Sequence, residues 1–223
     1  MPKDILKVMI GYDPNEVVAY HVLAHSIISR SSAPVSIIPV KLEHLEGHKK
    51  DPKGSTEFSL TRFLTPMLAG YTGQALFLDC DMLVRCDIKE LFDQCGHNKD
   101  VYVVKHDYTP KNETKFLDNE QHVYPRKNWS SMMLFNCAAC KRLTNSFVAD
   151  ATPSVLHQFK WCQDERIGEL GAEWNHLVGE GERNPEAKII HFTNGIPPFK
   201  GMGRQEFAQE WRAELKEMNY AAS

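Results

Sequence analysis

The sequence predicts an α/β fold, in which helices cover a sheet within a single domain. Strand-like apolar runs alternate with helix-like segments through the first third of the chain, a pattern typical of parallel strands joined by right-handed crossovers. The length of 223 residues fits one domain that can bury a substantial core. The composition, with 42% hydrophobic and 25% charged residues, is ordinary for a globular protein.

The first part of the predicted sheet consists of short apolar runs with helices between them. We expect strands at residues 7–12, 35–40 and 74–79 and a helix at residues 58–69. After the first strand, Asp13 is predicted to cap a helix that has Pro14 in its first turn and apolar residues at helical spacing as far as Ile28. Ligands of such sheets bind beyond the carboxyl ends of the strands, so Asp13 and Asp79 are expected to share a cleft.

The rest of the chain contains shorter apolar runs and one long polar segment. Further strands are expected at residues 82–85, 100–105, 131–135 and 188–192, and helical segments at residues 88–92, 138–149, 163–170 and 205–218. The last helix is amphipathic, with Phe207, Trp211 and Leu215 on one face, and we expect it to pack on the domain. The polar segment 107–128 is long for a plain connection, which indicates a functional loop or a small excursion.

Asp79 and Asp81, separated by Cys80, lie between two apolar runs at the predicted end of a buried strand. Two like charges side by side are costly to bury unless something pairs with them. A divalent cation would remove this cost, and carboxylate oxygens suit Mg²⁺ or Mn²⁺. Acidic pairs also occur as solvated turn residues, so the motif alone leaves both interpretations open.

His191 also ends a predicted strand, and it leads into a loop that contains Gly195 and Lys200. Two carboxylates and one imidazole can hold Mn²⁺ and leave coordination positions open for phosphate oxygens. Lys200 could contact a phosphate as a point charge. A histidine satisfied within the protein and a solvated lysine are the alternatives for these two residues.

Six short motifs occur in the order in which glycosyltransferases of family 8 carry them, and the chain resembles this family from residue 8 to about residue 201. The family contains glycogenin and bacterial lipopolysaccharide galactosyltransferases. The matching motifs are Tyr12-Asp13-x-Asn15, Ser59-Leu60-Thr61-Arg62-Phe63, Phe77 to Val84 around the acidic pair, Gln163-Asp164, Glu173-Trp174-Asn175 and His191-Phe192-Thr193-x-Gly195.

The resemblance implies a GT-A fold, with a Rossmann-like mixed sheet flanked by helices. It also implies a nucleotide-sugar donor, most often UDP-linked, a saccharide or other hydroxyl acceptor, dependence on Mn²⁺, with Mg²⁺ as the alternative, and transfer with retention at the anomeric carbon. Residues 1–203 would form the donor-binding and catalytic domain, and residues 204–223 the helix packed on it.

The resemblance assigns roles to individual residues. Asp79, Asp81 and His191 would bind the metal ion, and Gln163 and Asp164 would act near the anomeric carbon or the acceptor. The residues implied for donor binding are Gly11, Tyr12, Asp13, Arg62, Asp79, Cys80, Asp81, Gly195 and Lys200. Among these, Asp13 would contact the base and Lys200 the diphosphate.

Two departures from the family's pattern affect the sugar and acceptor sites. The family usually has Asn-Ala-Gly or Asn-Ser-Gly where this chain has Trp129-Ser130-Ser131. Its common Lys-Pro-Trp ending is replaced by Pro198-Phe199-Lys200-Gly201, so the role of Lys200 and the identity of the donor sugar are not inherited. We expect Trp129 and Ser130 to contact the sugar or the acceptor, together with Asp107.

Composition limits the other functions and the setting. A net charge of −3 argues against a nucleic-acid partner. No apolar run approaches the ~20 residues of a membrane span, and the first residues lack the apolar stretch of a signal peptide. We therefore expect a cytoplasmic protein whose six cysteines are reduced thiols; the sequence does not indicate the oligomeric state.

Two alternative functions fit part of this pattern. A sugar nucleotidyltransferase would usually need a Gly-rich phosphate loop after the first strand, where this chain offers only Gly11. A nucleotide-sugar-binding protein without turnover would use the same residues as the enzyme. The presence of Asp79, Asp81 and His191 favours catalysis over this second alternative but does not prove it.

Overall fold

The computed structural model of the chain describes residues 5–106 and 125–220. Its main sheet has six strands in the order β2-β1-β3-β6-β5-β7. These strands are β1 (Leu6–Tyr12), β2 (Val35–Lys41), β3 (Gln74–Leu78), β5 (Val101–Val104), β6 (Met132–Asn136) and β7 (Ile167–Leu170). β6 runs antiparallel to both of its neighbours and the other pairs are parallel, which confirms the predicted α/β fold with a mixed sheet.

A smaller sheet of three strands follows β3, in the order β4-β9-β8. Its strands are β4 (Met82–Val84), β8 (His176–Leu177) and β9 (Ile189–His191). β4 and β9 are antiparallel, with Met82 opposite His191, and Phe192 N donates to the carbonyl of Asp81 at 2.9 Å. This pairing brings the turn after β3 beside the end of β9, although the two segments are far apart in the sequence.

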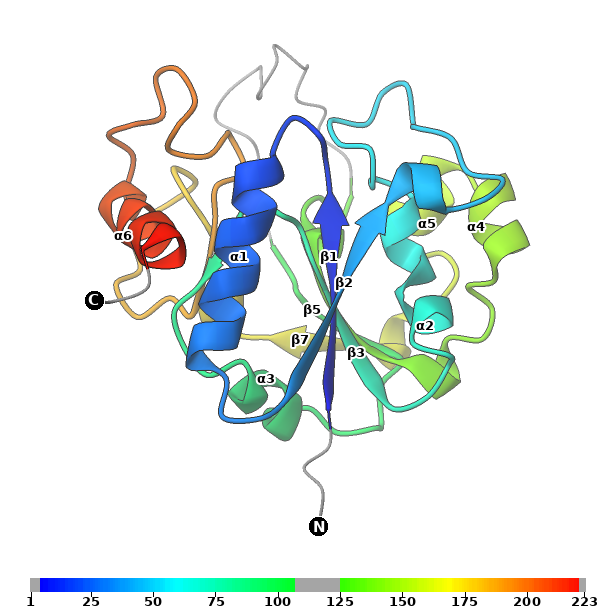
Figure 1. Ribbon diagram of the computed structural model, residues 1–223. Coiled ribbons are helices and arrows are strands. Elements are labelled where there is room, and N and C mark those ends of the chain that lie inside the picture. The colour runs from blue at the N-terminus through cyan, green and yellow to red at the C-terminus, as the bar shows by residue number, and fades with distance from the viewer. Residues whose placement is uncertain (1–4, 107–124, 221–223) are drawn as a thin grey trace.

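Helices cover both sides of the main sheet (Figure 1). The helices are α1 (Val17–Arg30), α2 (Thr65–Leu68), α3 (Lys89–Gln94), α4 (Asn145–Asp150), α5 (Pro153–His157) and α6 (Ala208–Asn219). Helices α1 and α6 lie on one side, whereas α2, α4 and α5 lie on the other. Between these layers the side chains of Phe77 in β3 and Phe135 in β6 are fully buried.

The C-terminal helix α6 packs on α1 through a hydrophobic cluster separate from the main core. Val22 of α1, Leu83 of β4, Phe192 after β9 and Trp211 of α6 all belong to this cluster. The expectation that this helix packs on the rest of the chain agrees with these contacts, while the division at residue 203 stays a prediction. Among the described residues, no helix combines the length and the apolar character that a membrane span requires.

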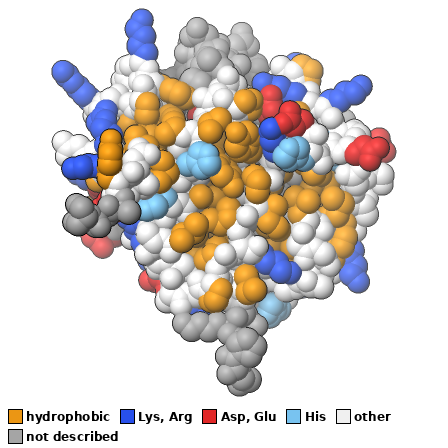
Figure 2. Space-filling view, viewed as in Figure 1, with side chains coloured by type: hydrophobic (Ala, Val, Ile, Leu, Met, Phe, Trp, Pro, Cys, Tyr) orange, Lys and Arg blue, Asp and Glu red, His pale blue; other side chains and the backbone are white. Residues whose placement is uncertain are grey.

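β2 is an edge strand of the main sheet, and all of its side chains except that of Val40 are exposed or only partly covered. Figure 2 shows hydrophobic side chains gathered on this face of the molecule, with Lys and Arg side chains mainly around its rim. Pro39 within β2 has no N–H to offer an additional strand, which protects the edge from pairing with another chain.

Asp13 does not cap the first helix, contrary to our expectation. The helix begins at Val17, and no side chain caps it. Asp13 instead closes the turn after β1, because its Oδ1 accepts from the backbone and side-chain nitrogens of Asn15, both at 2.9 Å. Its Oδ2 accepts from Glu57 N at 3.0 Å, which ties the loop before α2 to the end of β1.

Three predicted helices are shorter than expected or absent. Residues 58–69 form a 3₁₀ turn at Thr61–Leu64 followed by the one-turn helix α2. Residues 138–149 contain only α4, because a 3₁₀ turn and a loop precede Asn145. The helix predicted for residues 163–170 is wrong: a 3₁₀ turn at Asp164–Arg166 leads into strand β7.

Candidate metal and donor site

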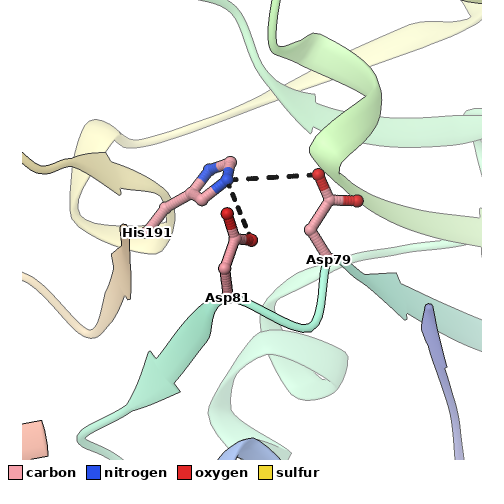
Figure 3. A group of neighbouring side chains, drawn as sticks. All are labelled: Asp79, Asp81 and His191. Carbon is pink, nitrogen blue, oxygen red and sulfur yellow. Dashed lines mark ion pairs between the residues drawn. The ribbon is translucent and has the colours of Figure 1, made fainter. Parts of the chain in front are cut away.

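Strand ends position the candidate metal ligands. Asp79 follows the last residue of β3, Asp81 precedes the first residue of β4, and His191 is the last residue of β9. The antiparallel pairing of β4 with β9 places the imidazole beside the two carboxylates. The three side chains point toward one another across this junction (Figure 3).

The geometry of this Asp79–Asp81–His191 cluster suits a divalent cation. His191 Nε2 lies 3.3 Å from Asp81 Oδ1 and 4.0 Å from Asp79 Oδ2, and one candidate ligand atom from each residue lies within 4.8 Å of the others. The side chains are mostly buried, at 13%, 16% and 3% exposed for Asp79, Asp81 and His191. Carboxylate oxygens and one imidazole nitrogen form a donor set that accepts Mn²⁺ or Mg²⁺.

A hydrogen bond behind His191 supports this fit. Its other ring nitrogen, Nδ1, lies 3.1 Å from Oδ1 of Asn175. An amide oxygen only accepts hydrogen bonds, so Nδ1 carries a ring proton, and Nε2 is the nitrogen that faces the carboxylates. This is the tautomer in which a histidine binds a metal ion through Nε2.

Arg62 holds Asp79 from the opposite side. Its Nη1 lies 2.8 Å from Asp79 Oδ1 and donates to the carbonyl of Ser130 at 3.0 Å, while the guanidinium lies 5.2 Å from the ring centres of both Phe58 and Phe77. Even so, burial raises the pKa of Asp79 to about 6, because it outweighs the attraction of Arg62. A bound cation would favour the ionised carboxylate.

Cys80 and Glu16 lie beneath the acidic turn. The Cys80 side chain is fully buried, and its thiol donates to Glu16 Oε2 at 3.5 Å. Only the backbone of Cys80 is therefore available to contact a nucleotide sugar. Burial, followed by the charge of Asp81, raises the pKa of Glu16 to about 8. Glu16 is therefore neutral at pH 7 and adds no third negative charge. The sequence gives no sign of this contact, since Glu16 precedes a helix like any other acidic residue.

The predicted donor residues at the end of β1 lie at the same edge of the sheet as Asp79. A Cβ on Gly11 would lie 2.4 Å from the ring of Phe58, so only glycine allows this ring to pack here. Tyr12 is half-buried between the ring of Tyr20, 5.4 Å away, and the ammonium of Lys41, 5.5 Å away. Asp13 is buried, and both of its oxygens already accept hydrogen bonds.

The terminal loop after β9 contains the other predicted donor contacts. Gly195 is buried with φ at +127°, a conformation that favours glycine, and its carbonyl accepts from Gln205 Nε2 at 2.8 Å. Glu206 Oε1 accepts from Gly179 N at 3.0 Å and lies 3.1 Å from His176 Nε2. Lys200 is exposed on this loop, and its contact with a diphosphate stays a prediction.

Trp129 and Ser130 lie in the 3₁₀ turn Trp129–Ser131 just before β6, and the carbonyl of the last residue of this turn, Ser131, accepts from Asp79 N at 2.9 Å. Ser130 Oγ lies 2.8 Å from His157 Nδ1 and Ser59 Oγ 3.3 Å from His157 Nε2. Burial, with a smaller effect of Arg62, lowers the pKa of His157 to about 3, so this imidazole is neutral. Sequence analysis missed His157, because no local pattern links it to either serine.

The structure does not join Gln163 and Asp164 to the cluster. Both precede β7, which runs in the same direction as β3, so they lie at the start of a strand whereas Asp79 lies beyond the end of one. Asp164 is 70% exposed and pairs with Arg126 at 2.7 Å. Neither residue belongs to the group of possible metal ligands among the described residues. Asp107 lies outside the described residues.

The fold is that of GT-A glycosyltransferases. The galactosyltransferase LgtC, solved with donor and acceptor sugar analogues, matches 98% of this chain and 98% of its own with a TM-score of 0.59 and 13% identity. The bifunctional glycosyltransferase WbbM matches 95% of this chain with a TM-score of 0.61 and 15% identity, and this chain spans 49% of its length. Mouse xyloside xylosyltransferase 1 matches 87% of this chain and 100% of its own, with a TM-score of 0.52 and 13% identity.

The chain belongs to the same family as Protein CDI of Arabidopsis thaliana. The two sequences are 44% identical over 229 aligned positions, which cover 97% of this chain and 88% of the Arabidopsis protein. No protein-family model matches the chain. Membership of glycosyltransferase family 8 therefore stays a prediction from the short motifs.

Proposed function

We propose that this protein is a retaining glycosyltransferase that depends on Mn²⁺ or Mg²⁺ and transfers a sugar from a nucleotide sugar, a UDP-sugar in the first instance, to a hydroxyl group of a saccharide or another acceptor. The observation that carries the proposal is the convergence of Asp79, Asp81 and His191 at the carboxyl end of β3. Ligands of open α/β sheets bind at this edge, and the similar fold of LgtC holds donor and acceptor sugar analogues.

The chemistry requires charge stabilisation at the leaving group. A divalent cation would neutralise the negative charge that builds on the leaving diphosphate. Arg62, fixed between Asp79 and the carbonyl of Ser130, keeps the Asp79 carboxylate in place. We propose that Lys200 and the backbone amides near Gly195 add fixed donors to the diphosphate from the terminal loop.

The sugar develops positive charge as the bond to the diphosphate breaks. Trp129 and Ser130, in the 3₁₀ turn whose last residue contacts Asp79, are proposed to contact the sugar or the acceptor, and Tyr12 and Asp13 the base. The roles that the resemblance implies for Gln163 and Asp164 stay predictions, because the two residues lie just before β7 and Asp164 pairs with Arg126. Attack from the face of the leaving group would give the proposed retention without a covalent intermediate.

The direct test is incubation of the protein with a panel of UDP-sugars and Mn²⁺, followed by detection of UDP and free sugar. Slow hydrolysis of one donor, abolished by a chelator and restored by Mn²⁺, is the expected result. Exchange that depends on pyrophosphate would indicate a nucleotidyltransferase instead. Binding of a UDP-sugar without any turnover would indicate a binding protein and contradict the proposal.

A further inference from the structure

Asn175 is buried behind His191, on the side of the imidazole that faces away from the carboxylates. It is 1% exposed and lies between β7 and β8. Its Oδ1 lies 3.1 Å from His191 Nδ1, and its Nδ2 donates to Ser131 Oγ at 2.9 Å. Both ends of the amide are therefore engaged within the protein, one by His191 and the other by Ser131.

Ser131 determines which way round the Asn175 amide lies. The Ser131 hydroxyl donates its single proton to the carbonyl of Asn128 at 2.7 Å, so toward Asn175 it can only accept. Only the NH₂ end of the amide can meet it there, which turns the carbonyl end toward His191. The direction of each hydrogen bond thus follows from the one before it.

Ser131 also contacts Asp79, another residue of the Asp79–Asp81–His191 cluster. Its backbone carbonyl accepts from Asp79 N at 2.9 Å, while its side chain acts on His191 through Asn175. Ser131, just before β6, is therefore linked to Asp79, which follows β3 of the main sheet, and to His191, which ends β9 of the smaller sheet.

We propose that Asn175 and Ser131 are positioning residues, which hold His191 in the tautomer and orientation that bind a divalent cation through Nε2. The inference rests on the proposed function, because it concerns the cation of that site. Neither residue contacts the reacting atoms, and both act through His191. Partners behind a metal-ligating histidine typically change metal affinity about 10–100-fold when they are removed.

The first test uses the metal-free protein at neutral pH. In nitrogen-15 NMR of labelled histidine, wild-type His191 is expected to carry its proton on Nδ1. In Ser131→Ala the amide of Asn175 is free to turn, so His191 is expected to shift toward protonation on Nε2. Protonation of wild-type His191 mainly on Nε2, or an unchanged tautomer in Ser131→Ala, would overturn the inference whatever the protein catalyses.

The second test measures Mn²⁺ binding by electron paramagnetic resonance, without substrate. Asn175→Leu and Ser131→Ala are expected to weaken binding by about 10-fold or more, whereas Asn175→Asp, which keeps an acceptor for Nδ1, stays within about 3-fold of wild type. Asn145→Leu is the matched control. Asn145 lies on α4, and this substitution removes its 2.8 Å hydrogen bond with His48, which is also an Asn–His contact.

The outcomes separate the inference from the proposed function. Wild-type affinity in both Asn175→Leu and Ser131→Ala would overturn the inference while leaving the metal site in place. Failure of the wild-type protein to bind Mn²⁺ would contradict the proposed function, and the tautomer of the metal-free protein would still decide the inference. If Asn175→Leu does not fold, the contrast between Ser131→Ala and Asn175→Asp decides the question.

Discussion

Glu16, Asp79 and Asp81 bring three carboxyl groups to one buried turn. Burial raises the pKa of both Glu16 and Asp79, and in each case the charge of Asp81 raises it further. Without a cation, the folded state must either protonate these groups or keep like charges close together, and both reduce stability. Arg62 and His191 offset part of this cost at Asp79, and the proposed divalent cation would offset more of it.

The substitution Asp81→Asn tests whether these carboxyl groups bind a cation and reduce the stability of the metal-free protein. The substitution removes a ligand and also a charge that opposes ionisation of its neighbours. We expect loss of Mn²⁺ binding and of metal-dependent turnover, together with a rise of about 2–4 °C in the melting temperature of the metal-free protein. Thermal unfolding with a chelator and with Mn²⁺ measures both effects.

Asp93→Asn serves as the matched control for this substitution. Asp93 is 61% exposed and, within the part of the chain that the structure describes, pairs with Lys89 alone, on the same helix, so the variant should keep wild-type binding. A folded Asp81→Asn protein with full activity would remove the proposed metal site.

Arg62 is buried, and its planar guanidinium makes polar contacts at its edges and aromatic contacts at its faces. It contacts Asp79, donates to the carbonyls of Ser130 and Ser59, and lies over two aromatic rings. Lysine keeps the charge but lacks this fork, so Arg62→Lys is expected to lower the free energy of unfolding by about 1–3 kcal/mol. Urea unfolding measures the change.

Arg212→Lys provides the comparison for that experiment. Arg212 is exposed and, among residues 5–106 and 125–220, donates to the carbonyl of Gly203 alone, so its replacement should change stability by less than about 0.5 kcal/mol. Equal effects of the two substitutions would show that the contacts of Arg62 contribute nothing specific.

The candidate metal ligands could be predicted from the sequence because strand ends carry a strong local signal. An apolar run ends at Asp79, another begins after Asp81, and a third ends at His191. Glu16 precedes a helix and gives no such signal, while Asn175 belongs to a motif that resembles family 8 but does not by itself indicate a contact with His191. Tertiary packing brings both residues to the site, so their contacts become visible only in the folded structure.

At the scale of elements, β5 and β7 pair through an aromatic ring that covers a glycine. Tyr102 lies opposite Gly168 in the register, and a Cβ on Gly168 would lie 2.3 Å from the Tyr102 ring. Gly168→Ala must displace this ring and its 2.7 Å hydrogen bond to Asn98. We expect a loss of about 1–3 kcal/mol in the free energy of unfolding.

A double-mutant cycle with Tyr102→Ala isolates this contact. If the clash is the cause, Gly168→Ala should be nearly neutral once the ring is removed, and the two effects should differ from their sum by about 1 kcal/mol or more. Additive effects in urea unfolding would show that the glycine is required for another reason.

The same pair explains why the helix predicted for residues 163–170 is wrong. The apolar spacing of Ile167 and Leu170 fits either one turn of a helix or a short strand. The segment forms a strand because four of its residues pair with β5. The sequence of residues 163–170 alone does not indicate this pairing. Short elements are therefore the part of this fold that local patterns determine least.

Boundaries of the other two shortened helices do have local signals that the predictions overlooked. Thr144 caps α4, since its Oγ1 accepts from Phe147 N at 3.1 Å, and a threonine before such a helix marks its start. Pro66 lies in the first turn of α2, where proline fits a helix start but not a helix interior. The long predicted helices at residues 58–69 and 138–149 run across these two signals.

At the scale of the whole molecule, α6 connects the terminal loop to α1. Phe192 and Ile196 of the loop pack in the same hydrophobic cluster as Trp211 of α6 and Val22 of α1. The segment that contains Gly195 and Lys200 is therefore supported by the last helix of the chain. Weakening the contact between α6 and α1 should destabilise the loop as well as the helix.

Glu214 is the polar centre of this contact and gives it a pH dependence. The side chain is 2% exposed and pairs with Arg30 at 2.6 Å and with His25 at 2.5 Å, both on α1. Burial opposes ionisation, but the hydrogen bonds from Arg30 and His25 outweigh it and hold the pKa of Glu214 below its usual value of 4.5. A lowered pKa in the folded state means stability that is present above pH 4.5 and is lost as the pH falls through the folded value.

Glu214→Gln should therefore destabilise the protein by about 1–3 kcal/mol at neutral pH, because it leaves Arg30 and His25 without their carboxylate. The difference from wild type should shrink as the pH falls below 4.5 and through the lowered pKa of Glu214 in the folded state, where the wild-type side chain also becomes neutral. Urea unfolding at neutral pH and across this acidic range measures this, with Glu217→Gln on the exposed face of α6 as the control. A difference that stays constant with pH would show that shape, rather than the charge of Glu214, holds α6 against α1.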